Sequence, residues 1–598
     1  MNSKEIDILY NNPLPSSRTG LFYNTFSYPT KISPETVAIY IAMHTEPGDT
    51  VLDIFGGSGS TGLGALMCEH PTEKMIEIVE ELGITPTWGA RNAEIYELGK
   101  YGSYASNVVC NPPNEEDFRL AAKEYFKKAH DELDWLYSCK DKLGNDAQIR
   151  HTVWSDMLIC PNCKHEITYY DLFVEHNPMA IKEYGKCPKC TFVGDKESFD
   201  NKLEEVQDTL LNKKICQRKR VPVLIYGQTS SRKWKRVINE DDIDLIKLIS
   251  KNFKFENYKP QSIEWGELYR SGYHTGITHL HHFYTQRNFY VMMKLWEMAD
   301  DYPEKIRDSL RLVLLSYNAA HSTLMSRVVV KKNSKDFVLT SAQSGVLYIS
   351  SLPVEKNIII GAERKIKTFF NAFKYVNTCS GKVNVVNQSS EMLNLDDKTI
   401  DYLFTDPPFG DFIPYSEVNQ INELWLGETT NKEKEAIISE AQNKDLNKYQ
   451  SMMTKIFVEA RRVLKDDSKA TVVFHSSKAE VWEAMKQVID SSKFNILNTS
   501  ILNKTQATFK QTVSKGSVQG DPVMLIEKGK VKEVIDNEPS SSEEILEKIL
   551  KESIGNEEVN VRLLYSKYIA KCLEKGLRVE WSAKEAYDYF YKRIGVEV

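Results

Sequence analysis

The chain has 598 residues, 41% of them hydrophobic, which is enough for several domains with packed cores. It carries 77 Lys and Arg against 83 Asp and Glu, so with a net charge of −6 any binding to an acidic polymer must come from local basic clusters. No apolar run approaches the length of about 20 residues that spans a bilayer, and no signal peptide is recognised. Both observations argue against a membrane protein or a secreted one.

The first motif is a glycine-rich loop after a short apolar strand. Residues 47–62 predict a turn, the strand, a loop with three closely spaced glycines, and the start of a helix. Glycines let the backbone pass close to a ligand, and the helix start offers unpaired amides. No Gly-Lys-Ser/Thr follows and the spacing is not Gly-x-Gly-x-x-Gly, so a phosphate loop is excluded. The motif predicts a nucleotide-type pocket.

Such a pocket needs an acidic residue for ribose hydroxyls at the end of the next strand. Glu97, which closes the run Ala93 to Glu97, is the candidate. It lies further from the loop than the usual separation of about 20 residues, and a helix over 73–82 accounts for the distance. A solvated glutamate at a strand end is the alternative. Downstream, Asn111-Pro112-Pro113-Asn114 is interpreted as a loop before a helix.

Two Cys-x-x-Cys knuckles follow, separated by 23 residues. Four thiolates at this spacing predict a closed, tetrahedral structural zinc site. The four ligands are Cys160, Cys163, Cys187 and Cys190. Disulfides are disfavoured because no signal peptide is recognised and the remaining cysteines are scattered.

A basic segment comes directly after the knuckles. Between positions 213 and 236 nine residues are basic and none is acidic, and an apolar strand over 221–226 separates two basic clusters. We expect a ribbon that contacts DNA phosphates without reading sequence, with a solvated charged surface as the alternative. The basic residues are Lys213, Lys214, Arg218, Lys219, Arg220, Arg232, Lys233, Lys235 and Arg236.

Three histidines, His279, His281 and His282, lie close together in the helical stretch that follows. With no carboxylate at helical spacing beside them, a structural or DNA-facing segment is favoured over a metal site.

Strands alternate with helices again beyond residue 376, which predicts a doubly wound sheet. Its strands are expected at 382–386, 400–404, 470–474, 495–501 and 523–527. The second of them ends in Asp406-Pro407-Pro408-Phe409, where open α/β sheets bind their ligands. A carboxylate, a rigid Pro-Pro corner and an aromatic ring are the parts that amino-group methylation of an extruded base requires.

Acidic residues around this motif leave two interpretations open. Asp396-Asp397 ahead of the strand is interpreted as a turn, with the adenine-ring contact that the family resemblance given below implies as the alternative. Asp411, Tyr415 and Glu417 after the motif either frame a base pocket or cap the next helix. At the end of the chain, Ser541 with Glu544 and Ser582 with Glu585 fit capping boxes, so a small helical appendage is expected.

Together these motifs resemble the amino-DNA methyltransferases, which modify adenine N-6 or cytosine N-4. Residues 28–31, the helix start at 33–35 and the glycine-rich loop resemble the cofactor half of that family, and residues 406–409 resemble its catalytic half. The chain is most similar to the large members that bear a zinc ribbon, over residues 151–156, 276–287 and 474–478 as well. The resemblance covers most of residues 20–527.

The resemblance implies where ligands bind. S-adenosylmethionine would be surrounded by Lys31, Asp53, Phe55, Gly57, Gly59 and Thr61, with Glu97 as the added candidate. The target base would be held by Asp406, Pro407, Pro408 and Phe409. Zn²⁺ is the expected structural metal and double-stranded DNA the expected partner. A restriction or phage-defence protein is a candidate second partner, and the family implies a prokaryotic, cytoplasmic protein that associates with the nucleoid.

The expected fold is α/β: a doubly wound, mostly parallel, Rossmann-like sheet of the S-adenosylmethionine-dependent methyltransferase type. The predicted parts are the cofactor half at 1–115, an insertion at 116–375, the catalytic half at 376–528 and the helical C-terminal appendage at 529–598. Within the insertion, the zinc ribbon is expected at about 151–200, the basic ribbon at about 205–240, and a helical target-recognition region after them.

Three functions compete. The first is a site-specific DNA methyltransferase of class EC 2.1.1. The resemblance favours adenine N-6 over cytosine N-4, because Asp406 rather than a serine leads the Pro-Pro motif, as in the adenine-modifying members of the family. The second is an RNA amino-methyltransferase of the same fold. The third is a catalytically silent, zinc-dependent DNA-binding subunit, against which the intact Asp406, Phe409 and Gly57 argue.

Overall fold

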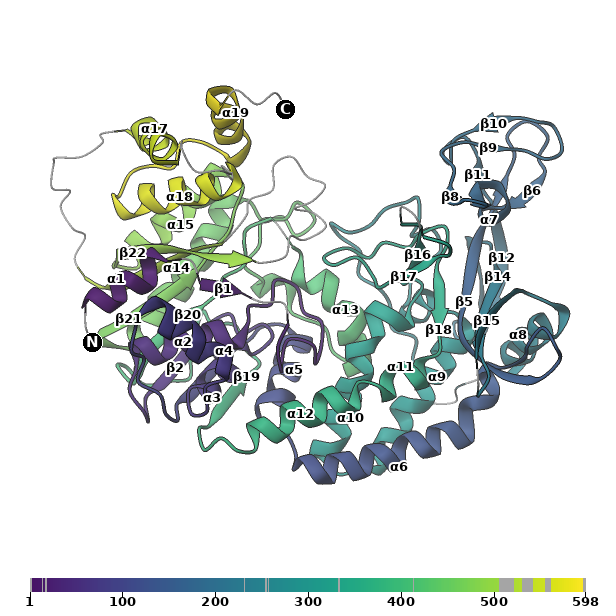
Figure 1. Ribbon diagram of the computed structural model, residues 1–598, viewed down its shortest axis with the longest axis horizontal. Helices are drawn as coiled ribbons and strands as arrows, with labels where there is room; N and C mark the ends of the chain where they lie inside the picture. The colour runs from purple at the N-terminus through teal and green to yellow at the C-terminus, as the bar shows by residue number, and fades with distance from the viewer. Residues whose placement is uncertain are drawn as a thin grey trace.

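Both ends of the chain contribute strands to one eight-stranded sheet (Figure 1). In spatial order the strands are β1 (Leu14–Ser16), β22 (Phe494–Lys504), β23 (Asp521–Lys528), β21 (Leu464–Val473), β20 (Ile400–Thr405), β2 (Thr50–Asp53), β3 (Asn92–Tyr96) and β19 (Val383–Val386). β23 runs antiparallel to both of its neighbours, and the other pairings are parallel. The predicted α/β class with a mostly parallel sheet is therefore confirmed.

The computed structural model describes residues 3–594, apart from 13, 17–18, 231, 253–254, 256–257, 332–333, 412, 505–520, 530–540 and 554–560. Parts of the predicted C-terminal appendage thus lie outside the described residues. Within these described ranges, none of the helices has the length and apolar character that crossing a lipid bilayer requires.

Helices cover both faces of the sheet, because neighbouring residues of a strand point to opposite faces. Val51 and Leu52 of β2 belong to two different apolar cores. One core takes up helices α2 (Pro34–His44), α3 (Ser60–Met67) and α5 (Lys100–Cys110). The other takes up α14 (Leu446–Val463), α15 (Ala479–Ser491) and α18 (Val561–Glu574).

The helices α17 (Ser542–Ser553), α18 and α19 (Ala583–Ile594) share the second core with the sheet. Tyr568 and Ile569 of α18 are fully buried there, and Thr499 of β22 donates a hydrogen bond to the carbonyl of Ala570. The expected appendage is therefore docked on the sheet.

The insertion forms a second lobe, drawn at the right of Figure 1. It begins with the long helix α6 (Glu115–Leu133), whose first turn is capped by the side chain of Asn114, as the Pro-Pro-Asn loop predicted. A ribbon then projects from it, built from β5 (Asp146–Ile159), β14 (Arg220–Gln228) and β15 (Lys233–Val237). The return to the sheet is helical, through α9 (Gln286–Met298), α10 (Glu304–Tyr317) and α12 (Ile366–Val376).

Candidate active site

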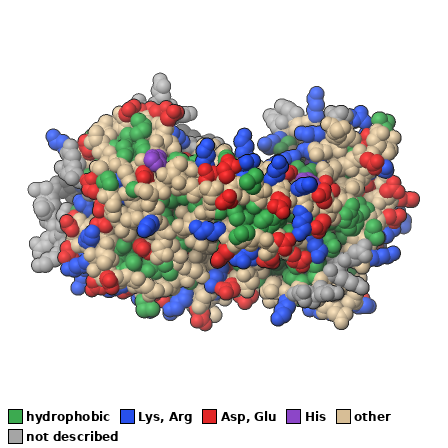
Figure 2. Space-filling view, turned by 90° about the horizontal axis from the view of Figure 1, so that it is seen from below, with side chains coloured by type: hydrophobic (Ala, Val, Ile, Leu, Met, Phe, Trp, Pro, Cys, Tyr) green, Lys and Arg blue, Asp and Glu red, His purple; other side chains and the backbone are tan. Residues whose placement is uncertain are grey.

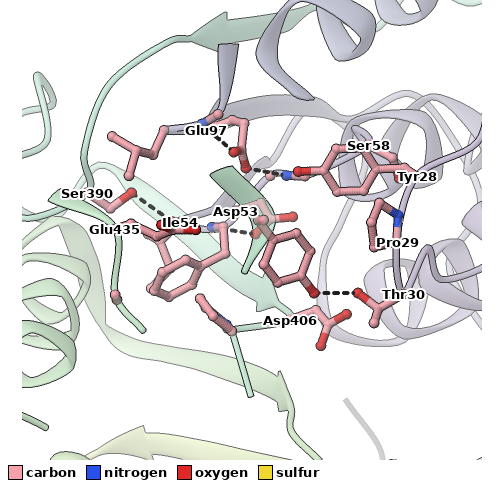
Figure 3. Close-up of a pocket in the computed structure, with 18 of the residues that line it drawn as sticks. Tyr28, Pro29, Thr30, Asp53, Ile54, Ser58, Glu97, Ser390, Asp406 and Glu435 are labelled. Carbon is pink, nitrogen blue, oxygen red and sulfur yellow. Dashed lines mark hydrogen bonds between the residues drawn. The ribbon is translucent and has the colours of Figure 1, made fainter. Parts of the chain in front are cut away.

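A pocket opens at the carboxyl ends of the parallel strands, the edge where sheets of this kind bind ligands. Asp53 ends β2, Glu97 follows β3, Ser390 follows β19 and Asp406 follows β20, and all four line the same pocket (Figure 3). Residues more than three hundred positions apart in the chain thus face one cavity, as the two motifs predicted.

The glycine-rich loop forms one wall of the pocket. Gly57 has φ +48° and its N–H donates a 2.6 Å hydrogen bond to Glu97 Oε2. Gly59, at φ +75°, lies directly before α3, and a Cβ there would come within 3.0 Å of Ser106. Both positions therefore require glycine. Gly59 itself does not line the pocket but supports the turn that does.

Asp53 joins the loop to the catalytic strand. Its carboxylate accepts hydrogen bonds from Thr61 Oγ1 at 2.6 Å, from the Phe55 N–H at 3.0 Å and from Thr405 Oγ1 at 2.9 Å. Burial raises the pKa of Asp53 to about 6, and the three donors oppose this rise. The side chain is held in one orientation at the base of the pocket.

Glu97 is also fixed by backbone amides. Besides Gly57, the N–H of Gly99 donates to it at 2.6 Å. Burial raises the pKa of Glu97 to about 7, because desolvation outweighs these two bonds. A half-buried carboxylate at the end of β3 is what a pair of ribose hydroxyls requires as an acceptor.

Lys31 closes the pocket on the side of the N-terminal loop. It is 8% exposed, and its ammonium donates a 2.9 Å hydrogen bond to the carbonyl of Phe22. Burial, together with the positive charge of the nearby Lys365, lowers the pKa of Lys31 to about 7. A negatively charged ligand group beside Lys31 would favour the charged form of its amine.

Within the Asp-Pro-Pro-Phe motif, Asp406 and Pro408 line the pocket. Tyr449 Oη donates a 2.7 Å hydrogen bond to the carbonyl of Pro408 and so braces the corner. Phe409 is only 5% exposed and packs against the rings of Phe474 and His475. In this conformation its ring belongs to the core under the corner and does not line the pocket.

The pocket contains residues that the motifs did not identify. Tyr28 and Tyr415 line it with their rings 6.2 Å apart and nearly parallel, and Tyr415 Oη is hydrogen-bonded to Thr30 at 2.8 Å. The sequence left open whether Tyr415 frames a pocket or caps the next helix, and its side chain lines the pocket. Gln388 and Ser390 line the pocket after β19; the general rule for strand ends was the signal that could have identified them.

The acidic residues whose role the sequence left open do not line the pocket. Asp397 is paired with Arg462 at 2.7 Å and Asp411 with Lys478 at 2.7 Å, and neither lines the pocket. Glu417 is buried and accepts the N–H groups of Glu267 and Leu268, so it anchors a loop of the insertion.

A comparison with known protein families finds a match to two regions of the chain. The family model of the N6_N4_Mtase type, described as DNA methylase, matches residues 4–71 and 400–575. Both regions match the model of the N-4/N-6 DNA methylase family. The first region contains the glycine-rich loop and the second contains Asp406. Glu97 and the insertion lie outside both.

Two solved structures share similarity with parts of the chain. One is PH0851, with 13% identity over 28% of this chain and 35% of that chain and a TM-score of 0.17. The other is the antibiotic-resistance methyltransferase Kmr, with 11% identity over 25% of this chain and 60% of that chain and a TM-score of 0.14. The chain spans less than two thirds of either structure. No curated protein matches it.

The pocket fits S-adenosylmethionine, the methyl donor expected for this methylase family. Glycine backbone allows close approach at the loop, Glu97 offers a carboxylate to ribose hydroxyls, and Lys31 offers a cation to a carboxylate. Ile54 and Phe55 also line the pocket with apolar side chains.

The four predicted cysteines come together at the end of the projecting ribbon. Their Sγ atoms all lie within 4.8 Å of one another, with 3.5 Å between Cys160 and Cys190 and 3.7 Å between Cys163 and Cys187. A zinc–sulfur tetrahedron with bonds of about 2.3 Å has edges of about 3.8 Å. The cluster can therefore hold a zinc ion.

The two knuckles have the same backbone turn. Lys164 and Thr191, each four residues after the first cysteine of a knuckle, have φ of 58° and 63°. Their N–H groups donate to the carbonyls of Cys160 and Cys187 at 3.0 Å. A hydrogen bond from the backbone of Phe192 lowers the pKa of the Cys190 thiol to about 6, which favours the thiolate that a metal binds.

The histidine segment has a carboxylate beside it that sequence spacing could not reveal. Asp208 Oδ2 lies 2.9 Å from His281 Nε2 and 2.8 Å from His282 Nε2. His282 Nδ1 accepts the N–H of Thr278 at 3.1 Å, which places the proton of this ring on Nε2, toward Asp208. Asp208 thus ties the ribbon to the helical part of the insertion. Its oxygen and the two ring nitrogens are also close enough together to hold a metal ion, which the sequence spacing did not indicate.

The basic ribbon separates into two groups of side chains. Arg218 and Arg220 are paired with the buried Asp156 at 2.9 and 3.0 Å, and Arg236 is paired with Asp242. Their charge is already compensated inside the ribbon. The side chains of the other group are exposed or half-buried: Lys213, Lys214, Lys219, Arg232, Lys233 and Lys235. Four of these have carboxylate partners of their own: Lys214 with Glu205, Lys235 with Asp336, Lys219 with Glu166 and Arg232 with Asp141.

Proposed function

We propose that this protein transfers a methyl group from S-adenosylmethionine to the exocyclic amine of a base extruded from DNA, with adenine N-6 as the target. The observation that carries the proposal is the shared pocket, in which the glycine-rich loop and Asp406 face one another across the ends of β2 and β20. The family match, which covers both motifs, supports it.

In this proposal the protein catalyses the reaction by holding the amine nitrogen and the methyl group in position for transfer. When bound, S-adenosylmethionine supplies an electrophilic methyl group on its sulfonium. The amine is a poor nucleophile because its lone pair is delocalised into the base. Asp406 would accept one amine hydrogen and a backbone carbonyl at the Pro-Pro corner the other, which orients the nitrogen and stabilises the positive charge that develops on it. After transfer, the carboxylate of Asp406 is the acceptor for the proton that the amine loses.

The structure suggests which aromatic side chains would contact the base. Tyr28 and Tyr415 present their rings to the cavity, whereas Phe409 packs beneath it. We therefore assign stacking to Tyr415 or Tyr28 in this conformation. Phe409 would stack on the base only after the corner rearranges around it.

DNA is the proposed substrate, and the insertion is proposed to contact it. On the face turned toward the bottom of Figure 1, acidic and basic side chains are interspersed (Figure 2). Phosphate contacts need a local excess of cations, so we place them instead on the exposed lysines of the ribbon, Lys213 and Lys233 among them. The cysteine cluster is proposed to hold structural zinc, which would fix the end of this ribbon.

Tritiated S-adenosylmethionine tests the proposal. Purified protein is expected to label double-stranded DNA, and hydrolysis of the product should yield N-6-methyladenine. The Asp406→Ala variant should lose at least about a hundredfold of the rate while its circular dichroism spectrum is unchanged. Label in N-4-methylcytosine would mean that the target is cytosine N-4 and not adenine N-6. Label on transfer RNA alone would replace DNA by RNA, and no label on either polymer would favour a silent DNA-binding subunit.

A further inference from the structure

A second cavity, of about 210 Å³, adjoins the candidate active site. Tyr28 and Lys31 line both cavities and form the partition between them. The opposite wall comes from the insertion, from Ser341 and from the π-helix Asn318–Ser322 that ends α10. π-helical turns are rare and frequent at functional sites. The second cavity thus lies between the methylase sheet and the inserted lobe.

Cationic groups gather around this cavity. Lys31, His321 and Lys365 line it, and Lys356 contacts His321 from behind. Lys365 is hydrogen-bonded to the carbonyl of Asn24 at 2.8 Å, and Lys31 to that of Phe22. Among the residues that the structure describes, none of these three lysines has a carboxylate within the 4.0 Å of an ion pair.

Burial of cations without counter-charges is costly, so groups of this kind tend to mark an anion site. Lys356 is 9% exposed and Lys31 is 8% exposed. Burial lowers the pKa of Lys356 to about 8 and that of Lys31 to about 7. A bound anion would reverse both shifts by favouring the charged form.

His321 adds a hydrogen-bond donor whose direction is set by Lys356. The ammonium of Lys356 lies 2.6 Å from His321 Nδ1 and donates to it. Burial and the positive charges of Lys356 and Lys365 lower the pKa of His321 to about 3, so the ring is neutral. Its proton is therefore on Nε2, which remains to donate to a ligand.

The occupant follows from the connectivity of the substrate. A base held beside Asp406 stays attached to its strand, so the phosphates that flank it must lie just outside the first cavity. We propose that the second cavity binds a phosphodiester group of the strand that carries the target base, through Lys365 and His321, with Lys356 orienting the His321 ring from behind. This inference rests on the proposed function and names the contact that holds the extruded nucleotide.

The test is the salt dependence of DNA binding, measured by fluorescence anisotropy on full-length protein with a labelled duplex. Each phosphate contact contributes about 0.9 to the slope of log K against log salt. Lys365→Gln should reduce the slope by about that amount and weaken binding about tenfold at low salt, whereas Lys365→Arg should retain both. Lys367→Gln, which changes an exposed lysine two residues further on in the first turn of α12, is the matched control and should behave as wild type. His321→Gln provides a second variant should the loss of the bond to Asn24 unfold the first.

Several results would overturn the inference. An unchanged slope in folded Lys365→Gln and His321→Gln, from a wild type that methylates DNA, would remove the phosphate contact while leaving the proposed function intact. An equal loss in Lys367→Gln would mean an unspecific charge effect. If about 10 mM inorganic phosphate raises the melting temperature of wild type but not of Lys365→Gln, and the slope is unchanged, the site binds a free anion and not DNA. The tritium assay tests separately whether the wild type methylates DNA, so a failure of the proposed function is distinguished from a failure of this inference.

Discussion

Thr405 Oγ1 donates a 2.9 Å hydrogen bond to Asp53 Oδ1, which links two residues 352 positions apart in the chain. Asp53 leads into the glycine-rich loop and Thr405 directly precedes Asp406. The bond therefore fixes the distance between the proposed methyl-donor site and the carboxylate proposed to hold the amine. In-line transfer depends on that distance more strongly than on any single charge.

Thr405→Val tests this link. The substitution keeps the shape of the side chain but removes a donor from a buried carboxylate, a loss of about 1.5–3 kcal/mol for a hydrogen bond to a charged group. We expect S-adenosylmethionine affinity, measured by isothermal titration calorimetry, to fall at least about tenfold, the change that 1.4 kcal/mol produces. Thr405→Ser keeps the hydroxyl and should bind like wild type. Equal affinity in all three proteins would mean that the bond has no role in the pocket.

Glu97 predicts a pH dependence of stability in the ligand-free protein. Its folded pKa of about 7 lies above the value of about 4.3 for an unfolded glutamate. The folded state thus binds the proton more tightly, and the stabilisation present below the unfolded pKa is lost as pH rises through 7. Since the side chain is half-buried, we expect a fall of about 1–2 kcal/mol between pH 5 and pH 8.

Urea denaturation at several pH values measures this fall. Glu97→Gln should flatten the profile, and Glu77→Gln, an exposed glutamate on helix α4 (Glu73–Leu82), should not. Asp53, with a folded pKa of about 6, also lowers stability as pH rises, but at lower pH than Glu97. Its contribution should persist in the Glu97→Gln variant. A wild-type profile that rises between pH 5 and pH 8 would show that Glu97 is ionised in the folded protein.

Sequence reasoning anticipated that the two motifs meet at one pocket because each motif is local. The strands, the glycine turn and the Asp-Pro-Pro corner are encoded within about ten residues each, and a parallel sheet brings their ends to one edge. The orientation of Phe409, by contrast, depends on Phe474 and His475, which pack against it from another strand end. The same holds for Arg220, whose partner Asp156 lies opposite it on the neighbouring strand β5. Contacts of that range have no signature in spacing, and both the pairing of the basic ribbon and the Asp208 tie were therefore not anticipated.

The cysteine cluster predicts one zinc ion per chain, measured by inductively coupled plasma mass spectrometry. Cys187→Ser removes a buried ligand and should lose the metal, and Cys216→Ser, which changes an exposed free cysteine, should retain it. Cobalt substitution should give the absorption of a tetrahedral thiolate site. A wild type purified without chelator that contains no zinc would exclude a structural metal here.

The two groups of basic side chains on the ribbon predict two different phenotypes. Arg218→Ala leaves the 1% exposed Asp156 with only part of its compensation and should destabilise the protein by about 3 kcal/mol. Lys213→Ala with Lys233→Ala removes exposed charges and should leave stability unchanged, but reduce the salt slope of DNA binding by about 1.8. Lys127→Ala with Lys305→Ala, two exposed lysines on α6 and α10, is the control pair. Equal DNA binding by both double variants would make the ribbon an ordinary solvated surface.

Tyr449 tests whether the Pro-Pro corner acts as a rigid support. Its hydroxyl donates to the carbonyl of Pro408 from the core side, 2.7 Å away, and its ring is fully buried. Tyr449→Phe keeps the packing and removes only this bond, so the corner gains freedom while the donor pocket around Glu97 is untouched. We expect kcat to fall by about tenfold, about 1.4 kcal/mol of positioning, with unchanged affinity for S-adenosylmethionine. The rate and the affinity are measured by tritium transfer and calorimetry. Because a purely structural role would lower the melting temperature without changing kcat in the folded fraction, that combination would assign Tyr449 to the core and not to the reaction.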